Sequence, residues 1–309
     1  MITGGFGFIG GNIIAKMHEH HEILVSSRSE SIPSAFTKFQ NLKLIKYDKL
    51  LSVESFPKDV NVLIHLANLN SNNCMLYPSE AINVNIDHSR MIFQNALVNK
   101  VSHVIYFSTS QVYGSILSGE INESTLPNPD NLYSITHRAA EDILKYLFKN
   151  IKGPIYSIIR LSNSYGTPID SNTNVWDLFV NNLCKTIVQS NKIIIKSNPN
   201  ILKDFIPMSS VTDCIDFLIN NSNSSNIYNL ASGTTITLLK MAERIKVIYE
   251  SEFPDSHLDI CIENHDESFV EFVFLNENLN ELGYKLKYNN FHDIRPLLKY
   301  CHKEFSKSI

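Results

Sequence analysis

The chain has 309 residues, of which 43% are hydrophobic and 19% charged, and its formal net charge is −4. These values are typical of a globular protein with a sizeable core, and they disfavour a nucleic-acid partner, which usually requires a basic surface. No apolar run is long enough to span a membrane, and no secretory leader pattern precedes the first motif, so we expect a cytoplasmic protein. The five cysteines include no Cys-x-x-Cys pair, which predicts reduced thiols and no metal site.

Short apolar runs alternate with amphipathic stretches along the first half of the chain. The runs that we predict as strands are residues 23–25, 42–45, 60–64, 104–107 and 156–161. Apolar residues three and four positions apart predict helices at residues 8–19, 80–99 and 132–150. This alternation of strands and helices predicts an α/β protein with a doubly wound parallel sheet. The Asn-rich stretch 68–73 is interpreted as a polar loop.

The pattern becomes less regular after about residue 165. Here we predict helices at residues 175–190, 209–220, 237–250 and 291–305, and strands at 192–196 and 226–230. Because no long linker separates the two regions, the second is expected to pack against the first.

Three glycines mark a turn close to the N-terminus. Gly4, Gly7 and Gly10 lie between the stub of a strand and a helix that starts near Phe8. In a Rossmann dinucleotide site the first glycine permits a tight turn, the second lets the backbone approach a pyrophosphate, and the third lets the helix pack against the strand. The helix N-terminus, at Phe8 and Ile9, then faces the phosphates, so we predict a bound nicotinamide dinucleotide.

The leading strand has only three residues before Gly4, fewer than an average strand has. We therefore expect either a very short first strand or further residues upstream.

The second predicted strand ends at Ser27 and Arg28, where a site that prefers NAD usually places an acidic residue. Arg28 suits a 2′-phosphate instead, so NADP(H) is favoured and NAD(H) stays open. Asp48, after the third strand, is either near the adenine or an ordinary loop residue.

Two later segments, together with the glycine turn, resemble the extended short-chain dehydrogenase/reductases. They are residues 107–114 (FSTSQVYG) and 133–137 (YSITH), and the resemblance continues in family order at 66–68, 160–168, 203–207 and 228–233. Members of this family mostly modify nucleotide-linked sugars as epimerases, 4,6-dehydratases or ketoreductases. The resemblance implies an NAD(P)-binding Rossmann domain over residues 1–165, to which 209–232 return. It also implies a smaller α/β region over 166–309 that binds a nucleotide sugar.

The resemblance also implies a role for each site residue. Tyr133 is expected to exchange a proton with the substrate oxygen, and the hydroxyl of Thr109 to share that oxygen. Leu66 and Ala67 would border the cofactor. The residues expected on the substrate side are Ser110, Gln111, Asn163 and Lys203.

Three departures from the family pattern bear on the reaction. His137 replaces the lysine that binds the cofactor ribose and lowers the pKa of the tyrosine by its charge. A free tyrosine titrates near pH 10 and a histidine near 6.5, so a mostly neutral imidazole supplies less of that effect, which favours ketone reduction over alcohol oxidation. Ser110 and Gln111 replace the carboxyl pair of the 4,6-dehydratases, so that reaction is disfavoured. Lys203 replaces an arginine of the diphosphate clamp and lacks its bidentate fork.

Three hypotheses follow from these residues. The first is NADPH-dependent reduction of a nucleotide-linked 4-keto (deoxy)sugar in the synthesis of surface polysaccharide precursors. The second is an epimerase with tightly bound NAD, and the third is a cofactor-binding protein whose catalysis has been altered at His137. The resemblance also implies a homodimer, in which helices matching 80–99 and 132–150 pair across a two-fold axis.

Overall fold

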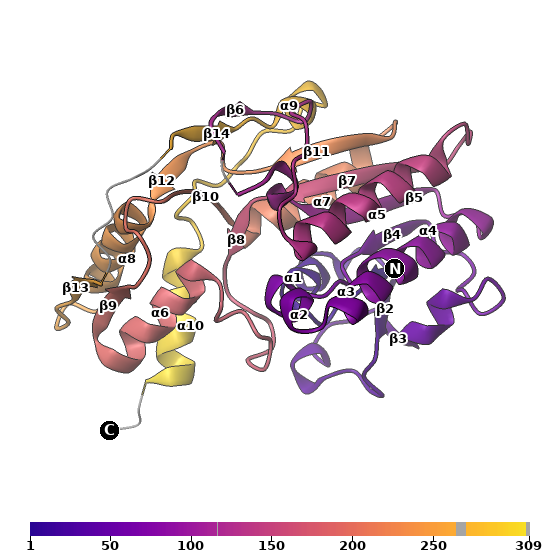
Figure 1. Cartoon of the computed structure of the whole chain (residues 1–309). Helices are drawn as coiled ribbons and strands as arrows, with labels where there is room; N and C mark the ends of the chain where they lie inside the picture. Colours follow the sequence, from indigo (N-terminus) through magenta and orange to yellow (C-terminus); the bar gives the residue numbers. More distant parts are fainter. Residues whose placement is uncertain (116, 264–269, 307–309) are drawn as a thin grey trace.

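A parallel sheet of seven strands forms the centre of the computed structural model, which describes residues 1–115, 117–263 and 270–306 (Figure 1). The order of the strands across the sheet is β11-β7-β5-β4-β1-β2-β3. Their bounds are β1 (Ile2–Thr3), β2 (Ile23–Ser27), β3 (Leu42–Lys46), β4 (Val62–His65), β5 (His103–Thr109), β7 (Ile155–Leu161) and β11 (Asn226–Leu230). The predicted α/β class with a doubly wound parallel sheet is confirmed.

Helices cover both faces of this sheet, because successive side chains of each buried strand point to opposite sides. On β5, Ile105 and Phe107 pack in the core shared with α1 (Phe8–Met17) and α7 (Met208–Asn221). On the other face, Val104 and Tyr106 pack with α4 (Ser89–Val98) and α5 (Leu132–Phe148). The β5 strand is buried along its whole length, which explains its nearly continuous apolar sequence.

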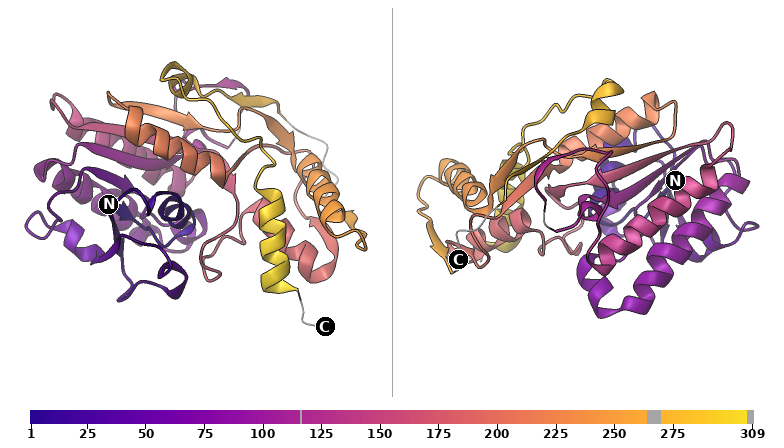
Figure 2. Two further views of the ribbon diagram at one scale, coloured as in Figure 1. Left: turned by 180° about the vertical axis from the view of Figure 1, so that it is seen from behind. Right: turned by 45° about the horizontal axis from the view of Figure 1, so that its top comes forward.

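The C-terminal part has a core of its own beside the sheet (Figure 2). Three helices build this core: α6 (Phe179–Ser190), α8 (Leu238–Glu252) and α10 (Ile294–Phe305). Short strands join it to the rest: β8 (Asn163–Tyr165), β10 (Leu202–Pro207) and β12 (Thr235–Thr237) in one sheet, β9 (Lys192–Ile195) with β13 (Asp259–Ile262), and β6 (Gly119–Ile121) with β14 (Phe272–Phe274). A short helix, α9 (Glu277–Glu281), follows β14.

The helix predicted at 80–99 is present as α3 (Pro78–Ile82), a π-helical turn (Asn83–His88) and α4, which follow one another without a break. One prediction just before this helix needs correction. The loop expected at 68–73 contains the start of α2 (Ser71–Leu76), because the side chain of Asn70 accepts a hydrogen bond from the N–H of Asn73 and caps the helix.

The first strand, β1, has only two residues, which agrees with the very short strand allowed by the sequence. The strand β11 joins the main sheet beside β7 although more than sixty residues separate them, and α7 packs against α1. The division into domains at residue 165 stays a prediction. Along the described ranges, no helix is both long and apolar enough to cross a membrane.

Candidate active site

The glycine turn forms a cradle at the carboxyl end of the sheet. Gly4 has a φ of +65°, and a Cβ on it would lie 3.2 Å from the backbone nitrogen of Ala67. A Cβ on Gly10 would lie 2.6 Å from the Cα of Gly5, which real structures do not tolerate. Gly7 precedes the first residue of α1 and supplies no side-chain cap, so backbone N–H groups at the start of α1 are free to bind an anion. The turn therefore fits the diphosphate of a dinucleotide.

Replacing Gly10 with alanine tests this cradle. We expect the free energy of unfolding to fall by about 1–3 kcal/mol, because the new methyl group meets backbone that cannot move aside. Gly11→Ala is the matched control, since the atoms nearest its Cβ would belong to the side chains of Phe36 and Ile169, at 3.1 and 3.3 Å, and not to backbone. Urea unfolding compares the two variants, and equal stability would contradict the proposed backbone contact.

The loop after β4 is held against the glycine turn by buried hydrogen bonds. The hydroxyl of Thr3 accepts from the N–H groups of Leu66 and Ala67, at 3.0 and 3.2 Å. Its own hydrogen is therefore free to be donated to His65 Nδ1, 2.8 Å away. Burial lowers the pKa of His65 to about 3, so its ring is neutral, and its Nε2 lies 3.0 Å from the hydroxyl of Ser89. These contacts place Leu66 at the edge of the predicted cofactor site.

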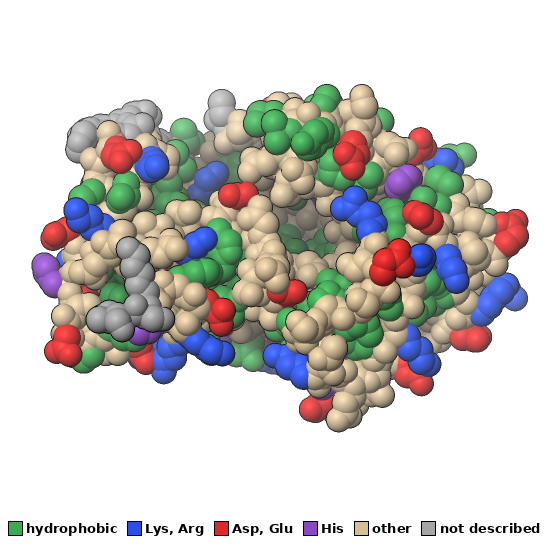
Figure 3. Space-filling view, turned by 90° about the horizontal axis from the view of Figure 1, so that it is seen from below, with side chains coloured by type: hydrophobic (Ala, Val, Ile, Leu, Met, Phe, Trp, Pro, Cys, Tyr) green, Lys and Arg blue, Asp and Glu red, His purple; other side chains and the backbone are tan. Residues whose placement is uncertain are grey.

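A pocket of about 510 Å³ runs from the glycine turn to the ends of β5 and α5. The surface is hollowed between the two parts of the molecule (Figure 3). The predicted site residues that line this pocket are Gly4, Gly7, Phe8, Ile9, Gly10, Leu66, Thr109, Ser110, Gln111, Tyr133, His137 and Asn163. The fold therefore brings together most of the predicted cofactor residues and the predicted catalytic residues.

The helix α5 presents two of these side chains to the pocket on successive turns. Asn131 caps the helix through its side chain, which accepts from the N–H of Ser134 at 3.0 Å, and the hydroxyl of Ser134 accepts from the N–H of Asn131 in return. Tyr133 and His137 follow four residues apart and therefore share one face. Their rings meet edge to face, with centroids 4.5 Å apart. Thr109 lies at the last position of β5, and its hydroxyl is near enough to Tyr133 to favour the ionised form of that residue.

The environment keeps a proton on Tyr133 at neutral pH. Burial raises its pKa to about 12, and the nearby hydroxyl of Thr109 only partly offsets this rise. Burial also lowers the pKa of His137 to about 3, so the ring carries no charge near pH 7. The site therefore holds a neutral acid beside a neutral imidazole, as the histidine at this position predicted.

A second cleft of about 360 Å³ adjoins the pocket, and the two share Ser110, Gln111 and Asn163. Lys203 lines the second cleft and forms no ion pair with any described residue. The residue is exposed as a whole, yet its ammonium is partly desolvated, which lowers its pKa. The side-chain oxygen of Gln111 faces the amide of Asn131 at 3.5 Å. The predicted substrate residues therefore lie together, next to Thr109.

Four predicted cofactor residues lie outside both clefts: Ala67, which follows the lining residue Leu66, and Ser27, Arg28 and Asp48. Ser27 and Arg28 are at the end of β2, where the backbone nitrogen of Gly4 donates to the oxygen of Ser26 at 3.2 Å, so they lie beside the glycine turn. Arg28 is exposed; burial raises the pKa of Tyr47 to about 12, and the charge of Arg28 offsets part of that rise. Asp48 is exposed in the turn that follows β3.

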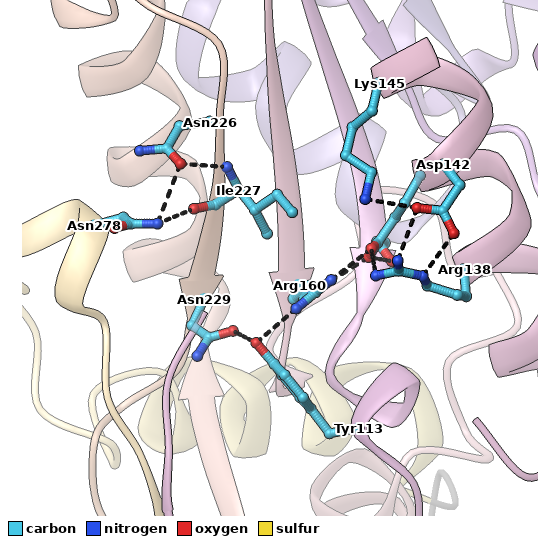
Figure 4. Close-up of polar contacts among 11 residues, drawn as sticks. Tyr113, Arg138, Asp142, Lys145, Arg160, Asn226, Ile227, Asn229 and Asn278 are labelled. Carbon is cyan, nitrogen blue, oxygen red and sulfur yellow. Dashed lines mark hydrogen bonds and ion pairs between the residues drawn. The ribbon is translucent and has the colours of Figure 1, made fainter. Parts of the chain in front are cut away.

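A buried network of hydrogen bonds lies behind the segment that carries Thr109, and the sequence analysis did not predict it. Glu141 on α5 binds Arg160 on β7 through two hydrogen bonds of 2.7 and 3.0 Å, and it also accepts from the hydroxyl of Ser108 at 2.6 Å. Arg160 extends to the hydroxyl of Tyr113 at 3.0 Å, which donates in turn to Asn229 at 2.7 Å (Figure 4). The segment that carries Thr109 is thus fixed on both sides. In the sequence, the network is indicated only by Glu141 and Arg160, two ionisable residues at positions where the apolar pattern predicts burial.

Two further features of the pocket could not be predicted from the sequence: buried polar atoms without a described hydrogen-bond partner, and hydrogen bonds around Asp177. The side-chain oxygen of Asn68 is buried and has no hydrogen-bond partner among the described residues, and the same is true of His137 Nε2. Both residues line the pocket. At its mouth, Asp177 accepts hydrogen bonds from Asn72 on α2 and from Asn174, at 3.3 and 3.2 Å.

The fold and this site define a nicotinamide-dependent oxidoreductase of the short-chain dehydrogenase/reductase type. The sequence pattern of the NAD dependent epimerase/dehydratase family matches residues 1–231, so the chain belongs to that family and is an enzyme that uses a nicotinamide cofactor.

Named proteins with similar sequences or folds act on nucleotide-linked sugars. The chain is 24% identical to ADP-L-glycero-D-manno-heptose-6-epimerase of Brachyspira hyodysenteriae, over 83% of this chain and 85% of that protein. It is 27% identical to dTDP-4-dehydro-6-deoxyglucose reductase of Escherichia coli, over 80% of each. The structure of UDP-N-acetylglucosamine 4-epimerase from Methanobrevibacter ruminantium M1, in complex with UDP-N-acetylmuramic acid, superposes with a TM-score of 0.83 at 22% identity, over 97% of this chain and 96% of that one. The predicted extended short-chain dehydrogenase/reductase family is confirmed.

Proposed function

We propose that this enzyme reduces a 4-keto sugar linked to a nucleotide, with NADPH as the reductant. The observation that carries this proposal is the pair of Tyr133 and His137. Tyr133 keeps its proton at neutral pH because burial raises its pKa, and the neutral ring of His137 provides no charge to oppose that rise. A protonated tyrosine is suited to giving a proton to a ketone oxygen and poorly suited to taking one from an alcohol.

Each residue of the pocket has a separate role in the proposed reduction. The nicotinamide, when bound, supplies the hydride that reaches the ketone carbon. Tyr133 holds a proton on its hydroxyl and gives it to the ketone oxygen. Thr109, whose hydroxyl lies near Tyr133, orients that oxygen. His137 Nε2 is buried without a described partner and would bind the cofactor ribose. Elimination of water is disfavoured because Ser110 and Gln111 provide no carboxylic acid.

The second cleft is proposed to hold the nucleotide part of the substrate. It adjoins Thr109 through Ser110 and Gln111, so a sugar at the catalytic end extends its diphosphate into this cleft. Lys203 supplies a positive charge there without an ion pair among the described residues. Asn163 is held by its side-chain amide, which donates to the backbone oxygen of Asp204 at 2.9 Å.

The assay is direct. Purified protein and NADPH are mixed with a panel of 4-keto-6-deoxy nucleotide sugars, and the loss of NADPH absorbance is followed. We expect oxidation of NADPH with at least one of them, and no oxidation with any would refute the proposal. An absorbance spectrum of the untreated protein tests the alternative, because stoichiometric NAD(H) retained through purification would favour an epimerase.

Arg28 is proposed to select NADPH over NADH through the 2′-phosphate. It lies beside the glycine turn, it is exposed, and no ion pair within the described ranges engages it. Arg28→Ala should weaken NADPH binding about tenfold, because charged hydrogen bonds to a phosphate are lost, and leave NADH binding nearly unchanged. Fluorescence titrations of both cofactors measure this ratio. An equal loss for NADH and NADPH would argue against a 2′-phosphate contact.

The oligomeric state and the cellular location of the enzyme are also proposals. We propose a homodimer through α4 and α5, where Val98, Ile135 and Tyr146 expose 56%, 46% and 76% of their surface. Light scattering after size-exclusion chromatography measures the mass. We also propose that the enzyme works in the cytoplasm, on precursors of a surface polysaccharide.

A further inference from the structure

Tyr106 lies behind His137, on the side away from the pocket. Its side chain is completely buried on β5. Its ring stacks between those of His65 and His137, with centroid distances of 5.8 and 5.9 Å and an interplanar angle of 26° in each pair. The hydroxyl of Tyr106 is 2.9 Å from Nδ1 of His137. This tyrosine is therefore in direct contact with the residue that replaces the family lysine.

The direction of this hydrogen bond follows from the surroundings of the hydroxyl. Burial raises the pKa of Tyr106 well above its ordinary value, so the hydroxyl keeps its hydrogen. Among the described residues, Nδ1 of His137 is the only partner of that hydroxyl. A hydrogen on Nδ1 would leave the tyrosine hydrogen buried without an acceptor, which costs free energy. Nδ1 therefore accepts, and the neutral ring carries its hydrogen on Nε2.

The other ring nitrogen of His137 belongs to the pocket. Nε2 is buried and has no partner within the described chain, while the residue lines the 510 Å³ pocket. We propose that Tyr106 is a positioning residue that fixes His137 in the Nε2–H tautomer. The ring then offers the pocket a neutral hydrogen-bond donor for a ribose hydroxyl of the cofactor. This inference rests on the proposed role of His137 as a ribose ligand.

At this position every molecule of the enzyme must direct a hydrogen-bond donor toward the cofactor. The ammonium of a lysine always presents hydrogens, whereas a neutral imidazole presents a donor on one nitrogen and an acceptor on the other. Without Tyr106 the ring is free to place its hydrogen on either nitrogen, and part of the population turns an acceptor toward the cofactor. The Tyr106 hydroxyl thus lets an uncharged side chain retain the hydrogen-bonding role of lysine without its charge.

Nitrogen-15 NMR of protein labelled at histidine tests the tautomer directly, and the disappearance of a signal in His137→Gln assigns it. In the wild type we expect Nε2 protonated and Nδ1 unprotonated. In Tyr106→Phe we expect the hydrogen to be shared between the two nitrogens and the Kd for NADPH to rise about three- to tenfold. Tyr284→Phe is the matched control, because it removes another buried tyrosine hydroxyl, which lies 3.2 Å from both the backbone oxygen of Ser210 and the carboxylate of Asp213. This control should change neither measurement.

The outcomes separate this inference from the proposed reaction. A wild-type His137 protonated on Nδ1, or a Tyr106→Phe protein with an unchanged tautomer, would overturn the role of Tyr106. A changed tautomer with an unchanged Kd for NADPH would overturn the donor role toward the cofactor. None of these measurements requires turnover, so the inference can stand even if no 4-keto sugar is reduced. If the Tyr106→Phe variant fails to fold, the wild-type spectrum still tests the inference, because a hydrogen on Nδ1 would overturn it.

Discussion

His137→Lys should make the enzyme at least tenfold faster at oxidising a nucleotide-linked alcohol with NADP⁺. The rings of Tyr133 and His137 are 4.5 Å apart, so an ammonium at position 137 would lie close to the tyrosine. A positive charge within about 4–6 Å lowers the pKa of an acid by about 1–3 units. Because the pKa of Tyr133 is about 12, the ionised fraction near pH 8 would rise about 10- to 1000-fold.

The pH dependence gives this prediction a second measurement. Oxidation needs the deprotonated tyrosine, so its rate in the wild type should rise with pH until the pH approaches the pKa of Tyr133. Reduction needs the protonated form and should stay level across the neutral range. In His137→Lys the oxidation profile should shift to lower pH. His137→Gln, a neutral replacement, is the control, and equal oxidation rates in the two variants would contradict an electrostatic role for position 137.

Breaking the buried pair of Glu141 and Arg160 should cost about 3–5 kcal/mol of the free energy of unfolding. The exposed fractions of the two side chains are 0% and 1%, so Arg160→Met would leave a carboxylate in the interior without its buried partner. Ser108 and Arg138, whose guanidinium lies 3.4 Å from Glu141 in a partly exposed position, do not replace the two hydrogen bonds that Arg160 provides. Urea unfolding followed by circular dichroism measures the loss.

An exposed ion pair serves as the matched control for this substitution. Arg90 and Asp87 form a pair on the surface, with side chains 43% and 61% exposed. Arg90→Met should therefore change the stability by less than about 1 kcal/mol. If Arg160→Met were no more destabilising than Arg90→Met, the network would not be what holds the Thr109 segment in place.

The sequence predicted the main sheet well because its signals are local. The β5 strand is buried on both faces and therefore appears as a continuous apolar run, and α5 shows regular helical spacing of its apolar residues. The π-helical turn at 83–88 was missed because one extra residue per turn leaves the apolar pattern nearly unchanged. Short strands such as β8 and β10 were missed because their pairing depends on partners far along the chain.

The site was predictable where motifs exist, and not where contacts between distant residues decide it. The glycine turn and the segments carrying Thr109 and Tyr133 could be found from spacing and resemblance. Tyr106 could not, because its role depends on a contact 31 residues away in α5. The pair of Glu141 and Arg160 joins a helix to a strand whose proximity only the fold establishes. The assignments of Arg28 and Asp48 to the cofactor stay predictions.

The buried neutral histidines have a consequence for acid tolerance. Burial lowers the pKa of His65 and His137 to about 3 and that of His103 to about 4, from an ordinary value of 6.5. The unfolded chain therefore takes up protons below about pH 6.5 that the folded chain refuses, and stability falls as the pH drops from there toward 4. Melting temperatures across this range should decline, and His137→Gln should flatten part of the decline. The burial that keeps Tyr133 protonated and His137 uncharged therefore also makes the folded enzyme less stable in mild acid.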